Sequence, residues 1–389
     1  MKVPFGDLKL HYQEYKEIFD QSVARVLSSG YYILGPELQR FEEEFAQYLG
    51  CNFTIGCASG TEAIYLALAV LDIKGGDEVL VVAHTAVPTI SAISMTGATP
   101  VFVDIDAQTM VIDVADLESK ITARTKVIVP VHLYGLMADM DGIKKIADKH
   151  NLPVIEDVAQ ATGAKHKGRR AGSIGRFGAF SFYPSKNLGA FGDGGAVSCQ
   201  TKEDYDRLLK LRNYGQSKRY HHDIVGINSR LDEIQAAILS AQIPFVDEWN
   251  DRRKEIAKRY TSSLKDIVQT PVEVTDSDHV YHLYVIQCEQ RNELQAFLES
   301  KGVGTLIHYP TPAHRQQAYR YLNYAAGSMP ATEAVANRIL SLPLFPELTN
   351  EQVDFVIEAI SEFFDANLRI SESIEKQLVT PVKAGTSRD

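Results

Sequence analysis

The residues of this chain best suited to chemistry are one lysine and one aspartate. Lys186 lies in an almost uncharged, glycine-rich stretch, residues 181–195, between apolar segments, and Asp157 ends an apolar run that begins at residue 153. Partial desolvation disfavours the ammonium form of a lysine and makes its amine a usable nucleophile. A buried acid at a strand end, in turn, needs a cationic partner. Covalent pyridoxal phosphate chemistry requires this pair, because the lysine forms the Schiff base and the acid keeps the pyridinium nitrogen protonated.

Each of the two residues has a simpler interpretation when taken alone. A single lysine is usually a surface residue, and Asp157 could be an N-cap or a metal ligand. No cluster of His or Asp surrounds it at ligand spacing, so we predict no metal site. The neighbourhood of Lys186 favours chemistry, because dense glycine beside one lysine indicates backbone that must approach a ligand closely. The neighbours are Phe180, Phe182 and Tyr183 before the lysine, and Gly189, Gly192, Gly194 and Gly195 after it.

A second candidate motif is Ala-Ser-Gly-Thr-Glu-Ala at residues 58–63, where an apolar strand gives way to a helix. Gly60 lets the backbone approach a ligand, and a helix N-terminus offers free N–H groups and a positive dipole to a phosphate. An ordinary N-cap is the alternative. No GxGxxG or GxxxxGK[ST] pattern occurs at this point, which argues against a dinucleotide or P-loop site. Gln160 is either a hydrogen-bond donor to a ring oxygen or a structural amide.

The elements that must position these residues alternate between short apolar runs and helical patterns. The runs lack strict alternation, which is typical of strands buried on both faces of a mainly parallel sheet. The predicted strands are residues 52–55, 78–83, 99–104, 126–131, 153–156, 178–182 and 196–199, and the helices between them include 60–71, 86–95 and 139–150. This order predicts an α/β fold with a mostly parallel seven-stranded sheet and helices on both sides.

The pattern changes after residue 230 and indicates a second, smaller domain of α+β type. Its predicted elements are two helices at 231–246 and 247–264, an apolar run at 280–286, and helices at 291–301 and 351–364. We therefore expect a large domain over residues 1–250 and a small one over 251–365. The amphipathic stretch 12–28 packs with one of the two domains. Residues 366–389 are polar, and we expect a frayed helix or a disordered tail.

Composition excludes several classes of protein. The net charge of −10 argues against a general nucleic-acid binder, although a small anionic substrate needs only local positive groups. No apolar run approaches membrane-spanning length, and the N-terminus lacks a signal-peptide core. The four cysteines show no CxxC pairing, so they are interpreted as reduced thiols of a cytoplasmic protein.

Five motifs in order give the chain a resemblance to the DegT/DnrJ/StrS family of sugar aminotransferases. The similarity runs from about residue 31 to residue 346, nearly the whole chain. Its most specific parts are Ser-Gly-Thr at 59–61, Glu-Asp-Val-Ala-Gln at 156–160, Phe-Ser-Phe-Tyr-Pro-Ser-Lys-Asn-Leu-Gly at 180–189, Gly-Ile-Asn-Ser-Arg-Leu-Asp-Glu at 226–233 and His-Tyr-Pro at 308–310. The resemblance implies the aspartate-aminotransferase fold (fold type I), bound pyridoxal 5′-phosphate, and a homodimer with shared active sites.

The resemblance also implies roles for individual residues. Lys186 would carry the cofactor and later shuttle protons, and Asp157 would pair with the pyridinium nitrogen. Gln160 would lie near the ring hydroxyl, and Asn228 would reach the cofactor phosphate from the partner subunit. The other implied contacts are Gly60, Thr61 and Ser181 to the phosphate, and Tyr183, Lys218, Arg219, Tyr220, His221, His308, Tyr309 and His314 to the sugar nucleotide.

The sequence departs from the family at the residue over the cofactor ring. Many relatives have an aromatic side chain at the position of Ala86. We expect either that His84 stacks on the ring or that Ala86 leaves the ring partly uncovered.

Two basic segments of the sequence have different interpretations. Residues 165–170 are most simply a solvated hairpin. Residues 217–222 combine charge with aromatic and imidazole groups, which suits the binding of a diphosphate and a base.

The resemblance finally suggests a substrate. The sequence 189–195 after the lysine and the segment 307–314 are similar to those of enzymes that act on dTDP-linked 3-keto-6-deoxyhexoses. We therefore expect transfer of an amino group from L-glutamate to C-3. The alternatives are a C-4 aminotransferase acting on a 4-keto sugar and a non-catalytic regulatory relative, although such a relative should have lost Lys186 or Asp157. A dehydratase of the same fold is disfavoured, because it would typically have His in place of the lysine.

Overall fold

The computed structural model describes the backbone of residues 1–379 and the side chains of residues 1–366. Its α-helices in this part of the chain are α1 (Leu8–Glu14), α2 (Lys16–Ser29), α3 (Pro36–Leu49), α4 (Gly60–Val70), α5 (Val87–Met95), α6 (Val114–Ser119), α7 (Met140–His150), α8 (Lys202–Leu211), α9 (Glu233–Gln242), α10 (Val246–Leu264), α11 (Arg291–Ser300), α12 (Pro330–Ala336) and α13 (Asn350–Val379). The predicted tail is helical as far as Val379, and residues 380–389 lie outside the described part.

A seven-stranded sheet forms the centre of the molecule. Its strands are β1 (Phe53–Cys57), β2 (Glu78–Val82), β3 (Thr99–Val103), β4 (Thr125–Val129), β5 (Ile155–Asp157), β8 (Phe177–Ser181) and β9 (Gly195–Cys199). Two ladders, β1-β9-β8-β5 and β3-β2-β4, are joined by parallel bridges between the β4 and β5 segments. The pairs β2–β3, β2–β4 and β5–β8 are parallel, and β9 runs antiparallel to both its neighbours. The predicted α/β class and mostly parallel sheet are confirmed.

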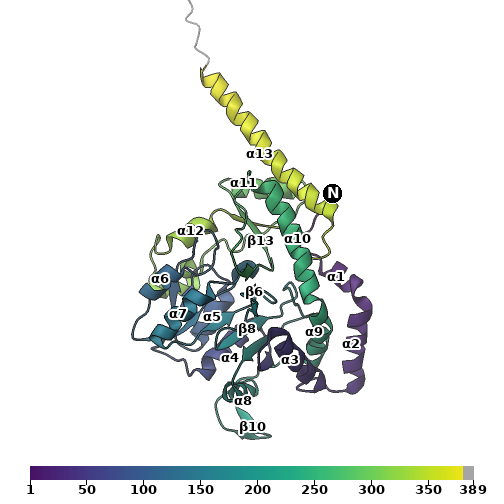
Figure 1. The fold of residues 1–389 in the computed structure, drawn as a ribbon, viewed down its shortest axis with the longest axis vertical. Helices are drawn as coiled ribbons and strands as arrows, with labels where there is room; N and C mark the ends of the chain where they lie inside the picture. The colour runs from purple at the N-terminus through teal and green to yellow at the C-terminus, as the bar shows by residue number, and fades with distance from the viewer. Residues whose placement is uncertain (380–389) are drawn as a thin grey trace, which may run out of the picture.

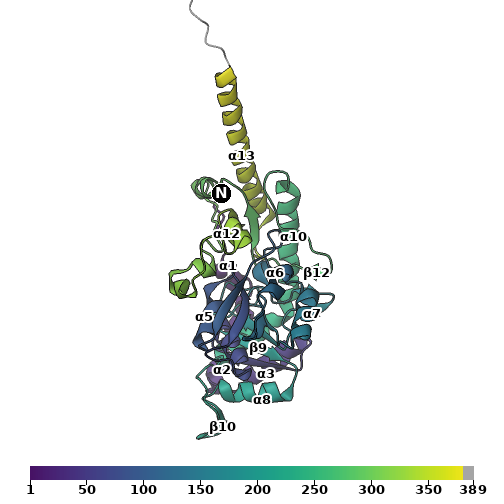
Figure 2. The same ribbon diagram turned by 90° about the vertical axis from the view of Figure 1, so that its left-hand side faces the viewer.

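Helices cover both faces of this sheet, because its strands are apolar on both sides. In β2, Leu80 and Val82 pack into one core with residues of α3, α7 and α9, while Val79 and Val81 pack into another with residues of α4 and α5. Alternate residues of a strand point to opposite faces, so a continuous Val/Leu run serves two cores at once. Figures 1 and 2 show the resulting three-layered body.

A third core lies where the chain returns after α10. It joins the second half of α10 to α11, to the first part of α13 and to the antiparallel pair β13 (Tyr284–Gln287) and β14 (Ile339–Leu342). Helix α10 spans the two regions, since Val246 belongs to the first core and Ile256 to the third. The domain boundary at residue 250 therefore stays a prediction that falls inside one continuous helix.

The N-terminal segment contacts both regions. Val3 forms a parallel bridge with Val303 and is buried in the third core. Phe19 of α2 packs edge-on against Phe191 of the lysine loop, with ring centroids 4.8 Å apart. The first thirty residues thus connect the outer core to the loop that holds Lys186.

Three short antiparallel pieces lie outside the main sheet. Strands β6 (Lys165–His166) and β7 (Arg169–Arg170) form the hairpin predicted at 165–170, with β12 (Ser277–Asp278) paired beside it. Arg170 is less solvated than expected, because it forms an ion pair with Asp247 (2.6 Å) and lies over the ring of Tyr48. Strands β10 (Gln216–Lys218) and β11 (His221–His222) project from the end of the body opposite α13 (Figures 1 and 2). No helix of the described chain combines the length and apolarity needed to cross a membrane.

Candidate active site

Lys186 is held in a tight loop between β8 and β9. The backbone N–H of Lys186 donates to Tyr183 O (2.8 Å), and that of Ala190 donates to Phe182 O (2.8 Å). A Cβ at Gly189 would come within 2.4 Å of Pro184 O, so this turn requires glycine. Burial lowers the pKa of the Lys186 amine to about 8, and the charge of Asp157 opposes that shift. The loop therefore presents an amine that loses its proton far more readily than an exposed lysine does.

Asp157 stands at the carboxyl end of β5 and is buried. Its Oδ1 accepts from Ala159 N (3.0 Å), and its Oδ2 accepts from the hydroxyl of Thr89 on α5 (2.8 Å). Burial raises the pKa of this carboxyl, and the two hydrogen bonds and the charge of Lys186 only partly offset that effect. Among the described residues no cation lies within ion-pairing distance of it, so the protein itself leaves this carboxylate without a close counter-charge.

Gln160 and Tyr309 meet next to this carboxylate. Gln160 Oε1 accepts from Tyr134 N (2.7 Å), and its Nε2 donates to the hydroxyl of Tyr309 (3.0 Å). Burial raises the pKa of Tyr309 to about 12, so its phenol stays protonated at neutral pH. The amide is fixed by both contacts, and Tyr309, which was predicted to contact the sugar nucleotide, lies beside Gln160.

His84 and His308 are connected through Tyr134. His84 Nε2 lies 2.7 Å from the Tyr134 hydroxyl, which donates to the backbone carbonyl of His308. His84 is fully buried, its Nδ1 has no partner in the described protein, and burial lowers its pKa to about 4. Burial also lowers the pKa of His308 to about 4. Both imidazoles are therefore neutral at pH 7.

The residues predicted to bind the cofactor phosphate lie together at the start of α4. Ser59 caps the helix by accepting from Glu62 N (3.2 Å). A Cβ at Gly60 would lie 2.6 Å from the Cβ of Ser181. Glycine at position 60 therefore allows the start of α4 to contact the end of β8. Thr61 follows in the first turn, and Gly60, Thr61 and Ser181 are all partly accessible. The arrangement places free helix N–H groups and two hydroxyls at one spot.

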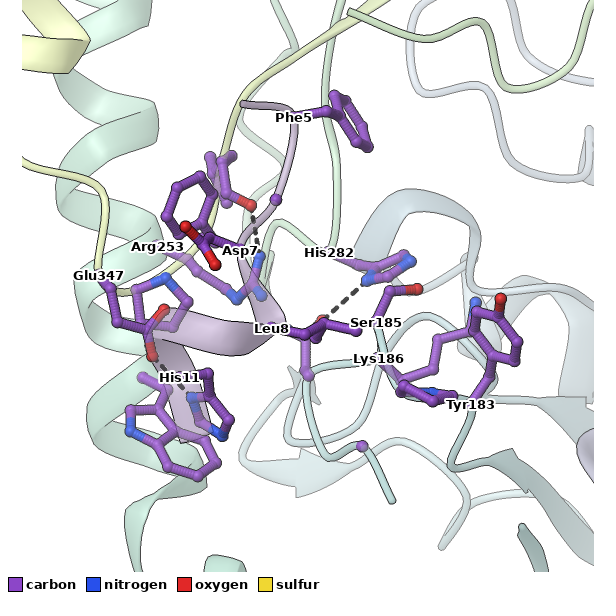
Figure 3. A pocket seen from close by; sticks show the side chains of 18 of the residues that line it. Phe5, Asp7, Leu8, His11, Tyr183, Ser185, Lys186, Arg253, His282 and Glu347 are labelled. Carbon is purple, nitrogen blue, oxygen red and sulfur yellow. Dashed lines mark hydrogen bonds and ion pairs between the residues drawn. The ribbon is translucent and has the colours of Figure 1, made fainter. Parts of the chain in front are cut away.

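A cavity of about 930 Å³ opens beside the lysine loop (Figure 3). Lys186, Tyr183 and His308 line it, together with the N-terminal segment from Phe5 to Tyr12, which was not predicted to take part. Other parts of the lining come from the lysine loop, from α9 and α10, and from residues 282–283, 306 and 344–347. Tyr183 is largely exposed at its edge.

Other predicted substrate residues lie elsewhere. His314 is buried, with Nε2 3.0 Å from Glu333 and its ring against Phe102, and it does not line the cavity. Lys218, Arg219, Tyr220 and His221 are exposed on the β10–β11 hairpin at the far end of the molecule (Figure 1). Asn228 is exposed as well, and its backbone pairs with Asn213. The single chain thus gathers the lysine, the aspartate and the cradle but not the hairpin.

The model of the DegT/DnrJ/EryC1/StrS aminotransferase family matches residues 13–361. The chain belongs to this family. It is 46% identical to the dTDP-3-amino-3,4,6-trideoxy-alpha-D-glucose transaminase of Streptomyces venezuelae, over 93% of this chain and 96% of that protein. It is also 46% identical to the dTDP-3-amino-3,6-dideoxy-alpha-D-galactopyranose transaminase of Aneurinibacillus thermoaerophilus, over 93% and 99%. The crystal structure of S. venezuelae DesV in complex with ketimine intermediate has a TM-score of 0.92, at 46% identity and 93% and 98% coverage.

This aminotransferase uses pyridoxal phosphate, which solved relatives hold in its pyridoxal or pyridoxamine form. The residues present fit that group. Asp157 is a buried acid without a close cation, Gly60 and Ser181 leave a cradle that a Cβ would fill, and Lys186 supplies the amine. Among the described residues no group of three or more His, Cys, Asp or Glu side chains is placed to hold a metal ion.

Sequence reasoning missed three side chains that shape the aminotransferase site: Thr89, His282 and Arg253. Thr89 had a usable signal, because the first turn of a helix after a parallel strand faces the carboxyl edge of the sheet. The sequence also held a signal for Arg253, because it precedes the buried residues Ile256 and Tyr260 by three and seven positions. This spacing places all three residues on the same face of a helix. The high charge of α10 obscured that pattern.

Proposed function

We propose that this aminotransferase moves an amino group from L-glutamate to C-3 of a dTDP-linked 3-keto-6-deoxyhexose, giving a dTDP-3-amino-3,6-dideoxyhexose. The observation that carries the reaction type is the partly buried amine of Lys186 near Asp157, a buried carboxylate that has no close cation among the described residues. Two of the relatives that are 46% identical are named as transaminases of dTDP-3-amino sugars, which supports the substrate. Amination at C-4 of a 4-keto sugar is the alternative to be tested.

When bound, pyridoxal phosphate supplies the electron sink for transamination. Lys186 carries the cofactor and, once released, moves a proton at its Nζ to and from the substrate carbon. A pKa of about 8 suits both directions, because a general acid and base works best near the operating pH. Asp157 holds the proton on the ring nitrogen, and Thr89 fixes the orientation of the carboxylate through the 2.8 Å hydrogen bond.

The same geometry supports the remaining assignments that we propose. Gly60, Thr61 and Ser181 bind the cofactor phosphate at the start of α4. Gln160 and Tyr309, already joined at 3.0 Å, lie at the ring hydroxyl side. His84 is enclosed and bonded to Tyr134, so we propose that it supports one side of the ring pocket. Tyr183 and His308 contact the sugar.

We also propose a homodimer in which each chain completes the site of the other. Asn228 and the basic residues Lys218 and Arg219 are exposed and stand away from their own cavity. Their charges suit the diphosphate of a sugar nucleotide held by the neighbouring subunit. The four free cysteines are in keeping with a cytoplasmic setting. Sedimentation velocity of the loaded enzyme should give a dimer, and a monomer that retains full activity would contradict this arrangement.

The decisive experiment follows cofactor colour and then product. The purified protein should be yellow and should bleach when L-glutamate is added. The bleached enzyme is next given dTDP-linked 3-keto and 4-keto sugars side by side, and NMR identifies the aminated carbon. Nitrogen at C-3 supports the proposal, and nitrogen at C-4 replaces it with the alternative. A colourless protein that takes up no cofactor overturns both.

A further inference from the structure

Arg253 is a buried cation that no carboxylate accompanies. It lies on α10, is 6% exposed and lines the cavity that begins at Lys186. Its Nη1 donates to the backbone carbonyls of Leu344 (3.0 Å) and Tyr281 (3.4 Å). Within the described part of the chain no Asp or Glu forms an ion pair with it, and Glu347 acts only as a more distant charge. Buried charges are normally paired, so this guanidinium lacks its expected counter-ion.

The nitrogens of Arg253 show which atom is left for a ligand. Nε is enclosed and has no acceptor. Nη1 is used by the two carbonyls. Nη2 makes no hydrogen bond to the described protein and is not among the enclosed atoms without a partner, so it is the nitrogen that faces the cavity. Burial lowers the pKa of the guanidinium to about 10, which still leaves it charged at neutral pH.

His282 separates this cation from the catalytic lysine. Figure 3 shows its ring between Arg253 and Lys186, and the charges of both residues add to burial in lowering its pKa well below the usual value. Its Nδ1 donates to Asn187 Oδ1 at 3.1 Å. A neutral imidazole gives the guanidinium no compensating charge. His282 thus adds no charge between Lys186 and Arg253, and Arg253 is a cation on the wall of the cavity that Lys186 also lines.

We propose that Arg253 binds the side-chain carboxylate of the amino donor L-glutamate, through Nη2, while the α-amino group reaches the cofactor at Lys186. The inference rests on the proposed function and adds the donor subsite to it. A carboxylate suits this cation better than a diphosphate, because one free nitrogen is available and the carboxylates of Asp7 and Glu347 line the same cavity. Glu347 is itself held by His11 at 2.6 Å, and Lys9 on the cavity edge is exposed.

The test compares two amino donors that react with the same yellow form of the enzyme. L-glutamate and the dTDP-3-amino-3,6-dideoxyhexose each bleach the cofactor in a single turnover, so apparent affinity and limiting rate are read separately. The variants are Arg253→Gln and Arg253→Lys, with Arg259→Gln as the matched control. Arg259 lies on the same helix but pairs with Asp354 outside the cavity. Binding of glutarate, a dicarboxylate without an amino group, is measured by calorimetry as a readout without turnover.

We expect Arg253→Gln to lower the affinity for L-glutamate and for glutarate by about tenfold to a hundredfold. Loss of one hydrogen bond to a charged group has an effect of this size. Arg253→Lys should recover part of that loss. Bleaching by the amino sugar should keep its affinity, and Arg259→Gln should leave every measurement unchanged. The preference of the enzyme for L-glutamate over L-glutamine should fall in Arg253→Gln, since only glutamate presents the negative charge.

Three outcomes would overturn the proposal. Equal losses for glutamate and the amino sugar would show a structural role for Arg253. Weaker inhibition by dTDP with unchanged glutamate affinity would assign the cation to the nucleotide diphosphate. If Arg253→Gln does not fold, then unchanged affinities for L-glutamate and glutarate in Arg253→Lys count against the subsite, because lysine cannot reproduce the geometry of the guanidinium. Failure of the unmodified enzyme to bleach with either donor would instead refute the proposed function.

Discussion

Glu156 and Asp157 are neighbours on β5, yet the protein treats their carboxylates in opposite ways. Glu156 lies on one face of the strand and is fully buried. Its Oε1 accepts from the N–H groups of Ile174 (2.8 Å) and Gly175 (2.6 Å), and its Oε2 from Gly172 N (3.0 Å) and His132 Nε2 (3.0 Å). These partners outweigh burial and lower its pKa.

Asp157 faces the other side with only two donors, Thr89 and Ala159, and its pKa is raised. Both carboxylates are equally removed from water, so the difference is how many partners the protein supplies. A carboxylate that is fully bonded fixes the fold, whereas one that is left short of donors has capacity for a ligand. The two faces of one strand thus separate structure from chemistry.

The buried arginines repeat this contrast. Arg212 pairs with Glu42, and its Nη1 also donates to Gly56 O (2.9 Å). Arg253 donates to two carbonyls but has no carboxylate partner among the described residues. The first closes a link between α8 and the start of the sheet, and the second faces the cavity. Arg291 of α11 is also buried and has no carboxylate partner among the described residues, so Arg253 is set apart by its place on the cavity wall as well as by its incomplete pairing.

The largest effect is expected from Lys186→Ala. The variant loses the amine that carries the cofactor and moves the proton, so turnover should fall by at least about ten-thousandfold. Assay of L-glutamate consumption with the keto-sugar measures it. Lys202→Ala, a change of an exposed lysine, is the control and should keep normal activity. Near-native transamination by Lys186→Ala would remove the assignment on which the comparison depends.

Asp157→Asn should have the next largest effect. The amide keeps the shape of the side chain but cannot hold a proton on the ring nitrogen, and loss of one such electrostatic contact costs about a hundredfold to a thousandfold in rate. The limiting rate of bleaching by L-glutamate measures it. The folded protein should remain intact, because the carboxylate is short of partners. A variant with unchanged rate but lower stability would reverse the roles given to the two acids.

Much of the fold could be predicted because it follows from local patterns. The strands around Val79 and Ile128 are continuous runs of Val, Leu and Ile, a composition that is typical of strands buried on both faces. The lysine loop was predictable from its glycines. Residue roles such as those of Lys186 and Asp157 came from recognised motifs rather than from periodicity.

The parts that could not be predicted depend on contacts between distant segments. Nothing near Glu156 in sequence shows that its partners come from residues 172–175 and His132. The N-terminal segment looked only amphipathic, yet it forms one wall of the cavity. His314 stood in a motif of the family but is bonded to Glu333 away from that cavity. The β10–β11 hairpin has no role that one chain alone can show.

Glu156→Gln should have a smaller effect, and on stability rather than on rate. The amide would place an N–H₂ against backbone donors and leave buried N–H groups unpaired, which costs about 2–3 kcal/mol in the free energy of unfolding. Denaturant unfolding followed by fluorescence measures it. The limiting rate per folded molecule should stay within about threefold of the unmodified enzyme, because Glu156 faces away from the site. A large loss of rate with normal stability would contradict the division between the two faces.

The smallest effect concerns the stability of the cofactor-free protein, to which Glu156 and Asp157 should contribute with opposite dependences on pH. The pKa of Glu156 is lowered from 4.5 on folding, so its carboxylate adds stability above pH 4.5 and that stability is lost as the pH falls further. The pKa of Asp157 is raised from 3.8, so its ionised form destabilises the fold at pH 7 and the cost disappears as the pH falls towards 4. At pH 7 we expect Glu156→Gln to be less stable than the unmodified protein and Asp157→Asn to be more stable.

Both differences in the free energy of unfolding should shrink below about pH 4.5, where the unmodified carboxylates take up protons. Urea titrations at pH 7 and pH 4 measure them. Added pyridoxal phosphate should then reverse the order for Asp157→Asn only, because the bound ring supplies the positive charge that the carboxylate lacks in the free protein. If the cofactor stabilised Asp157→Asn as much as it stabilised the unmodified protein, the shortage of partners at Asp157 would have no bearing on cofactor binding.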